Sequence, residues 1–152
     1  MTSPSAPLPT SERQAIARRH LEMENAYRLQ ETLDTLTPDC VFEDMALGER
    51  VQGHAAAAAY YQRWWTGFPD LTWVPQRRAF TEDGVVSELI VRGTHRGDYL
   101  GIAPTGKTIE LPVAIFVSFA DGRMASERLY YDLATLLRQL GVTRLPRIDA
   151  GG

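Results

Sequence analysis

The chain contains a single cysteine, Cys40, among its 152 residues. One cysteine cannot form an internal disulfide, and no second cysteine stands nearby to complete a CxxC redox or zinc motif. We therefore expect Cys40 to be a small buried residue rather than a nucleophile. The same scarcity favours a cytoplasmic protein.

Histidine and net charge are also scarce. The three histidines, His20, His54 and His95, are too scattered along the chain for a metal site of ordinary spacing. The formal net charge is only −3, and the charged residues are spread along the sequence, which argues against nucleic acid as the main partner. We therefore expect neither a metal nor a nucleic-acid partner.

Long apolar runs and secretion signals are missing too. No stretch approaches the roughly twenty apolar residues that a membrane-spanning helix needs, so no membrane partner is expected. The first ten residues are rich in proline and serine, which indicates a disordered tail and not a signal peptide. A second loose tail is expected over 144–152, which leaves one domain over 11–143.

The first half of the chain predicts helices. Ser11 followed by Gln14 resembles a capping box and predicts the start of one long helix. Apolar residues then recur at near-helical spacing until Thr37-Pro38 ends the run. A short strand is expected over 40–44 and a turn over 47–50. The alanine-rich stretch 53–66 predicts a second helix. The apolar positions of the first helix are Ile16, Met23, Tyr27, Leu29, Leu33 and Leu36.

The second half predicts an antiparallel sheet. The pairs Asp83-Gly84 and Asp121-Gly122 each separate runs rich in β-branched and aromatic residues, which is the pattern of a tight hairpin. Strands are expected over 72–81, 85–96, 107–120 and 123–131, long enough that the sheet must twist and bend. A short helix follows, with Asp132 as its N-cap and Gly141 as its stop. The fold class is therefore α+β, with a pocket at one end of a concave sheet.

Nothing in the sequence indicates a nucleotide cofactor. Gly93, Gly97 and Gly101 follow a strand, but they lead to Pro104 and not into a helix, as a dinucleotide-binding loop would.

Five motifs in order give the chain a family resemblance. They are Phe68-Pro69-Asp70, the segment GTHRG over 93–97, PTGK over 104–107, DGRM over 121–124, and Asp132 with LLRQLG over 136–141. This series resembles the SnoaL-like polyketide (ester) cyclase family of the nuclear-transport-factor-2-like superfamily, from about Val41 to Gly141. The resemblance implies a cone-shaped barrel in which a strongly curved mixed or antiparallel sheet wraps around N-terminal helices. It also implies a homodimer without metal or organic cofactor.

The resemblance also implies a catalytic residue. In the founding cyclases an aspartate acts as general acid and base in an intramolecular aldol closure, and the matching position here is Asp132. A pocket histidine assists it there, and the matching position is either His95 or the one held by Ser118. The structural alternative for Asp132 is helix capping, which favours the ionised form of the carboxyl group and makes Asp132 a poor acid. The structural alternative for His95 is a histidine that forms hydrogen bonds to loop carbonyl groups.

Strand alternation suggests which charged residues enter the pocket. Arg92 and Glu88 share one face, which could bind an anionic oxygen but which we interpret as a solvated convex face. Glu127 and Arg128 point to opposite sides, and the parity of Asp132 selects Arg128 as the pocket residue. Aromatic walls for a flat ligand, or plain core, are then expected from five side chains, which are Tyr61, Trp64, Trp65, Phe116 and Tyr130.

Three functions follow as hypotheses. The leading one is a cofactor-independent cyclase of specialised metabolism in which Asp132 moves a proton beside a carbonyl group of a small molecule. The second is epoxide hydrolysis, with a water held by Asp132, by Arg128 or Arg92, and by Glu88 or Asp44. The third is a binding or scaffolding module with a vestigial pocket, which an interior filled by aromatic side chains would favour.

Overall fold

The structure is a computed structural model that describes residues 6–144. Residues 1–5 of the tail expected over 1–10, and 145–152 of the tail expected over 144–152, lie outside the described residues. Thr10, the last residue of the first expected tail, already belongs to the first helix. The helices are α1 Thr10–Asn25, α2 Leu29–Asp34, α3 His54–Gly67 and α4 Leu133–Gln139. The strands are β1 Leu36–Asp44, β2 Glu49–Gln52, β3 Thr72–Phe80, β4 Gly84–Thr94, β5 Thr108–Ala120 and β6 Arg123–Tyr131.

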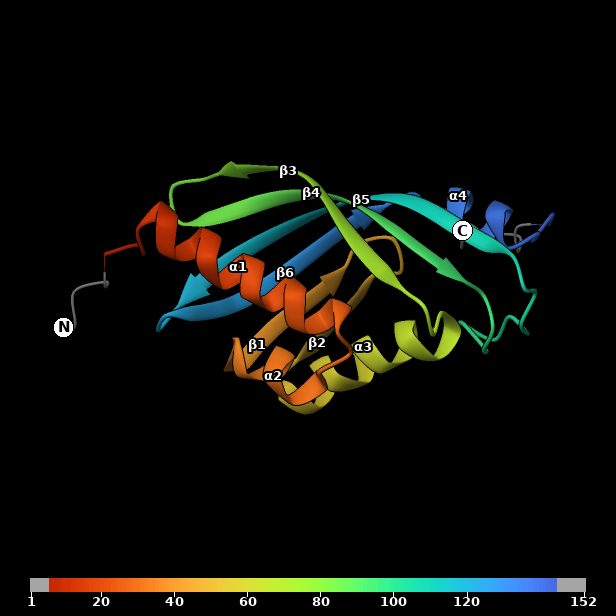
Figure 1. Cartoon of the computed structure of the whole chain (residues 1–152), viewed down its shortest axis with the longest axis horizontal. Helices are drawn as coiled ribbons and strands as arrows, with labels where there is room; N and C mark the ends of the chain where they lie inside the picture. The colour runs from red at the N-terminus through yellow and green to blue at the C-terminus, as the bar shows by residue number, and fades with distance from the viewer. Residues whose placement is uncertain (1–5, 145–152) are drawn as a thin grey trace, which may run out of the picture.

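The six strands form one curved sheet in the order β2-β1-β6-β5-β4-β3. Only the β1–β6 pair is parallel, and the other four neighbouring pairs are antiparallel. Helices α1, α2 and α3 lie on the concave side of the sheet, and α4 lies against one end of it (Figure 1). The expected α+β class and the curved mixed sheet around N-terminal helices are confirmed.

The two Asp-Gly pairs mark the β3–β4 and β5–β6 hairpins, as predicted. At the second, Asp121 and Gly122 both have positive φ angles of 51° and 70°, which a tight hairpin turn requires. At the first, the Thr81 side chain accepts a hydrogen bond from the Gly84 amide and closes the turn. Helix α4 begins after Asp132, and Gly141 beyond it has a positive φ of 81°, also as predicted.

The N-terminal half differs from the prediction in four respects. Strand β1 begins at Leu36, inside the region predicted as helix, and not at residue 40. The single long helix is wrong, because the chain breaks at Tyr27, whose φ of 58° is left-handed, and α2 starts at Leu29. The expected turn over 47–50 contains the start of strand β2 at Glu49. The apolar stripe is not the buried face of α1 either, because the buried residues of that helix are Arg13, Ala17, His20 and Glu24.

Large side chains fill most of the space between the helices and the sheet. Trp64 of α3 is 1% exposed and packs against Trp73, Tyr99 and Tyr131 with ring centroids 5.0 to 6.0 Å apart. Cys40 is buried as predicted. Burial of such aromatic area supplies much of the stabilisation of a domain of this size.

Candidate functional site

The inner face of α1 carries polar side chains into the core. Arg13, Ala17, His20 and Glu24 follow one another at intervals of four, three and four residues, so they lie on one side of the helix. Arg13 uses its guanidinium to donate to the carbonyl oxygens of Thr81 and Gly84, at 2.9 and 2.6 Å. His20 and Glu24 lie deeper in the cone.

His20 is held from both of its ring nitrogens. Its Nδ1 lies 2.6 Å from Oγ1 of Thr35, and that hydroxyl donates its own proton to the Thr32 carbonyl, so Nδ1 must be the donor. Its Nε2 lies 3.0 Å from the carboxylate of Glu127, which can only accept. Because both nitrogens donate, His20 is present as the imidazolium ion.

The charges around His20 agree with this assignment. Burial by itself lowers the pKa of His20, but the charge and the hydrogen bond of Glu127, together with those of Glu24, outweigh it and raise the pKa to about 10. Glu24 lies 3.6 Å from Nε2. Burial raises the pKa of Glu24 despite the nearby imidazolium. The surroundings of Glu24 therefore favour its neutral form more than water does.

A small cavity lies beside this cluster, between α1 and the sheet. Its volume is about 40 Å³, enough for about one water molecule and far below the several hundred Å³ of a pocket for a drug-sized ligand. The polar side chains on its wall come from α1, β3, β4 and β6 and are His20, Glu24, Arg78, Ser87 and Glu127. Trp73 and Met124 are among the apolar residues that complete it.

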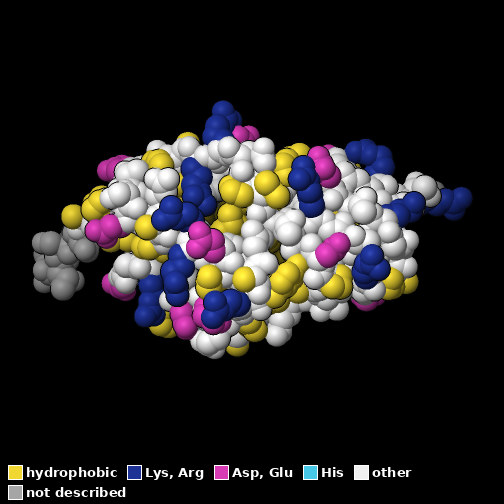
Figure 2. Space-filling view, viewed as in Figure 1, with side chains coloured by type: hydrophobic (Ala, Val, Ile, Leu, Met, Phe, Trp, Pro, Cys, Tyr) yellow, Lys and Arg dark blue, Asp and Glu magenta, His cyan; other side chains and the backbone are white. Residues whose placement is uncertain are grey.

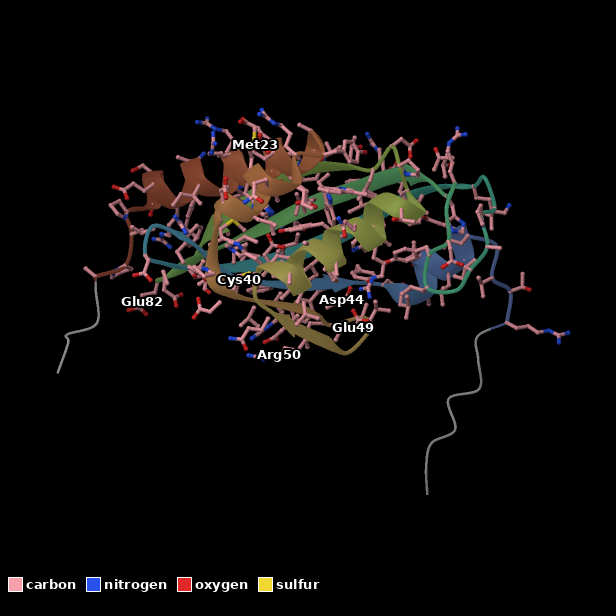
Figure 3. All side chains as sticks on the ribbon, turned by 90° about the horizontal axis from the view of Figure 1, so that it is seen from below. Met23, Cys40, Asp44, Glu49, Arg50 and Glu82 are labelled. Carbon is pink, nitrogen blue, oxygen red and sulfur yellow. The ribbon has the colours of Figure 1, made fainter. Side chains whose placement is uncertain are left out.

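A second buried carboxylate, Asp44, lies at the end of β1, under α3 (Figure 3). It accepts hydrogen bonds from the hydroxyls of Tyr60 and Tyr131, at 2.7 and 2.9 Å, and from the Leu47 amide at 3.0 Å. Burial and the neighbouring Asp44 raise the pKa of Tyr60. With its oxygen atoms bonded to two tyrosine hydroxyls and a backbone amide, Asp44 has the contacts of a structural residue.

Asp132, the predicted catalytic residue, lies at the surface as the N-cap of α4. Its carboxylate accepts from Thr135 Oγ1 at 2.7 Å and from the Ala134 amide at 3.0 Å. The bonds from Thr135 and the helix amides lower its pKa. The prediction that Asp132 faces an apolar cavity is wrong, because its side chain is exposed at the start of α4.

His95, the second predicted catalytic residue, is fully buried away from the His20 cavity. Its Nδ1 accepts a hydrogen bond from the Thr105 amide at 3.2 Å and lies 3.0 Å from the hydroxyl of the same residue. Its backbone bonds to Lys107 and Gly106 close the 96–106 loop. These contacts match the structural alternative for His95, except that its ring bonds an amide and a hydroxyl of the loop and not carbonyl groups.

The predicted polar binding residues lie on the convex face of the sheet. Arg92 pairs with Glu110 at 3.2 Å, and Glu88 pairs with Arg77, as the convex interpretation expected. The choice of Arg128 over Glu127 is wrong, because Arg128 is exposed and pairs with Glu43. Side chains alternate between the two faces of a strand, so Glu127 shares the inner face of the sheet with the buried Leu129.

Three more predicted residues share this convex side. Phe116 and Tyr130 are 45% and 42% exposed and pack edge to face, with ring centroids 5.6 Å apart. Ser118 lies close to Ser126, with 2.5 Å between the two hydroxyl oxygens. Phe116, Ser118 and Arg128 line one shallow outer hollow of about 290 Å³. The epoxide-hydrolase set is not assembled, because Asp44 is interior while Asp132, Arg92, Arg128 and Glu88 lie at the surface.

The predicted aromatic residues of α3 belong to the core. Tyr61 and Trp64 are 2% and 1% exposed, and Trp65 is half-buried against Tyr27. Tyr61 alone reaches the candidate site, with its hydroxyl 3.2 Å from His20 Nε2.

Sequence reasoning missed Glu24, Arg78 and Glu127, and it gave His20 no role. Two signals were available. The spacing of Arg13, Ala17, His20 and Glu24 is helical although only one of them is apolar, and Glu127 shares strand parity with the buried Leu129.

Comparison with known proteins identifies the family of this chain and finds the same fold in solved structures. The sequence profile of the SnoaL-like polyketide cyclase family matches residues 14–140. The chain belongs to that family. The predicted resemblance is thereby confirmed, and it extends further toward the N-terminus than the five motifs indicated. No functionally curated protein shows significant similarity to the chain.

Several solved structures of this family and fold are similar. AclR from Streptomyces galilaeus, provisionally described as a hydroxylase, is 25% identical, with a TM-score of 0.77 over 91% of this chain and 100% of its own. IdmH from Streptomyces antibioticus, provisionally described as a polyketide cyclase, is 26% identical, with a TM-score of 0.73 over 85% and 98%. A SnoaL-like protein from Jannaschia sp. CCS1 has a TM-score of 0.80 over 95% and 99%, and its 21% identity supports the fold alone.

Three further observations bear on ligands and partners. None of the helices described is long and apolar enough to cross a membrane. Within residues 6–144, no group of three or more His, Cys, Asp or Glu side chains is arranged to hold a metal ion. Acidic and basic side chains are interspersed on the face that carries α1 (Figure 2).

Proposed function

We propose that this SnoaL-like protein is an enzyme that moves a proton at a carbon beside a carbonyl group of a small molecule, as in an intramolecular aldol closure. The observation that carries the proposal is the buried cluster of His20, Glu24 and Glu127 on the wall of an internal cavity. Buried titratable groups at a cavity are the usual mark of acid–base chemistry.

Glu24 is the proton-transferring residue in this proposal. His20 is a poor base, because it already carries both ring protons and bonds through them to Thr35 and Glu127. Glu24 has no such short bond to a cation, and burial raises its pKa toward the range in which a carboxyl group both takes and returns a proton. Glu127 acts as a positioning residue that holds the imidazolium in place.

The substrate must enlarge the cavity. At about 40 Å³ the space does not admit a polyketide. Some of the apolar side chains that line the cavity are only half-buried and so can move most easily, and they include Leu21 of α1 and Ile115 of β5. The proposal therefore includes an outward movement of these side chains when a ligand enters.

We infer the remaining properties from the family. The enzyme is expected to need no metal or organic cofactor, to act in the cytoplasm, and to serve specialised metabolism.

We also propose that two copies pair through their convex sheet faces. Phe116 and Tyr130 expose apolar surface there, and the oppositely charged Arg128 and Glu43 lie nearby, which suits a self-complementary interface. Phe116→Asp is expected to convert a dimer into a monomer in sedimentation velocity, while Leu100→Asp, in a loop, leaves it unchanged. A wild-type monomer contradicts this assembly.

The proton-transfer proposal is tested with acetoacetate in D₂O, by following the loss of the C2 proton signal by NMR. Glu24→Gln is expected to slow the enzyme-dependent exchange at least about a hundredfold. Glu22→Gln is the matched control, because Glu22 lies on the same helix with its side chain 62% exposed. Equal exchange in wild type and Glu24→Gln contradicts the assignment.

The filled interior also favours a second candidate, a non-catalytic binding or scaffolding module. Trp64 occupies the space that a large ligand needs. This candidate predicts no exchange above buffer in any variant, and no shift of the melting temperature with aromatic polyketides.

A further inference from the structure

A β-bulge in the edge strand β3 turns one arginine toward the cavity. The pairing of β3 with β4 shifts register between Pro75 and Arg77. Before the shift Trp73 points inward, so regular alternation would bring Arg77 to the inner face. The extra residue instead leaves Arg77 outside, paired with Glu88 at 2.7 Å, and places Arg78 on the cavity wall. Bulges beside functional sites commonly re-aim a side chain in this way.

Arg78 has no counter-ion in this position. None of the ion pairs formed by residues 6–144 includes it. Its Nε is buried without a hydrogen-bond partner among these residues. Burial and the like charge of Arg18 lower its pKa, so its surroundings offer no compensating negative charge.

The neighbouring carboxyl groups do not supply that charge. Glu127 and Glu24 both lie against His20, with 3.0 and 3.6 Å between their carboxylate oxygens and its Nε2, and neither forms an ion pair with Arg78. A guanidinium group that is partly desolvated and unpaired is costly, and a carboxylate offers it two parallel hydrogen bonds. The cavity thus has one cationic group at its wall that an anionic ligand can satisfy.

We propose that Arg78 binds the carboxylate of a small keto-acid substrate and so directs its acidic C–H group toward Glu24. This inference rests on the proposed function and narrows its substrate class. In the step it serves, the carbon between carbonyl and carboxylate gives its proton to the ionised carboxylate of Glu24, which becomes the neutral acid. The electron pair of the broken C–H bond forms the enolate. The acid proton of Glu24 exchanges with the solvent, and Glu24 then returns a proton or, in D₂O, a deuteron to the same carbon and is ionised again.

The test compares acetoacetate with methyl acetoacetate, which lacks the charge. Binding is followed by NMR, through ligand line broadening and through the Nε–H resonance of Arg78. Wild type is expected to bind acetoacetate about ten- to a hundredfold more tightly than the ester, with a shift of that resonance. Arg78→Gln is expected to abolish the preference. Arg77→Gln, the adjacent outward-facing arginine, is expected to retain it.

The outcomes separate this inference from the proposed function. A preference for acetoacetate that survives in Arg78→Gln, or no binding of acetoacetate by wild type, overturns the anchor. If Arg78→Gln does not fold, Arg78→Met serves in its place, because it keeps the apolar stem. Binding that depends on Arg78 without any deuterium exchange supports the anchor and contradicts the proton-transfer function. Exchange that is equally fast with the ester and in Arg78→Gln contradicts the anchor alone.

Discussion

Glu127 lies within β6, and Asp132 follows the last residue of the same strand, five positions later. One side chain is buried and the other is exposed. The side chain of Glu127 is 7% exposed and lies against a buried imidazolium ion at 3.0 Å. Asp132 is exposed and accepts hydrogen bonds from the first turn of α4, which lower its pKa. The chain passes from inside the cone to its surface between the two.

This difference separates two ways in which a carboxylate can be held. A helix cap keeps Asp132 ionised and in contact with water, which suits stability but weakens it as a proton donor. Burial raises the pKa of Glu24, and Glu127 is held by an ion pair with His20. Position in a family motif therefore points to Asp132, whereas burial and charge point to the cluster on α1 and β6.

The largest expected effect on the comparison of Glu127 with Asp132 is the loss of stability in Glu127→Gln. Removing one partner of a buried ion pair leaves the other charge uncompensated, at a cost of about 3–5 kcal/mol of unfolding free energy. Urea unfolding measures the loss. The neighbouring Arg128→Gln, which changes an outward-facing side chain, is the control and should leave the urea midpoint nearly unchanged. Equal midpoints for the two variants would mean that the inner pair contributes nothing.

A smaller effect is expected from pH. The folded-state pKa of His20 is raised to about 10 from an ordinary value near 6.5. The folded state therefore keeps a proton that the unfolded state has lost, so its stabilising contribution is complete below pH 6.5 and disappears as the pH rises to 10. The raised pKa of Glu24 acts in the same direction.

Urea unfolding from pH 6 to pH 10 tests this dependence. Wild type is expected to lose stability progressively across the range, and His20→Gln is expected to show a flatter profile. Parallel profiles would show that His20 is not the group that titrates.

The sheet could be predicted from the sequence because its signals are local. The four strands over 72–131 follow from two Asp-Gly turns and from β-branched runs, and each lies within a few residues of its predicted range. The break at Tyr27 was missed, because a left-handed tyrosine has no local signature and its hydroxyl reaches the distant Leu71 carbonyl.

The site could be predicted only in part, because it depends on which face of each element is buried. Polar residues on α1 line the core, so apolar periodicity points to Ile16 and Met23 instead of His20 and Glu24. The bulge at 75–77 reverses alternation in β3 and hides Arg78 from any argument based on parity. Such features follow from tertiary packing, which one sequence does not reveal.

The smallest effect is expected for Asp132→Asn, and it bears most directly on the comparison. An asparagine keeps a side-chain oxygen that can accept the Ala134 amide, so the N-cap survives and the melting temperature should fall by no more than about 2–4 °C. Deuterium exchange into acetoacetate should stay within about twofold of wild type, because Asp132 lies outside the cavity that holds Glu24. A hundredfold loss with an unchanged melting temperature would instead restore Asp132 as the acid–base residue. It would then follow that α4 moves during turnover, since only a displaced helix start could bring that carboxylate to a substrate inside the cone.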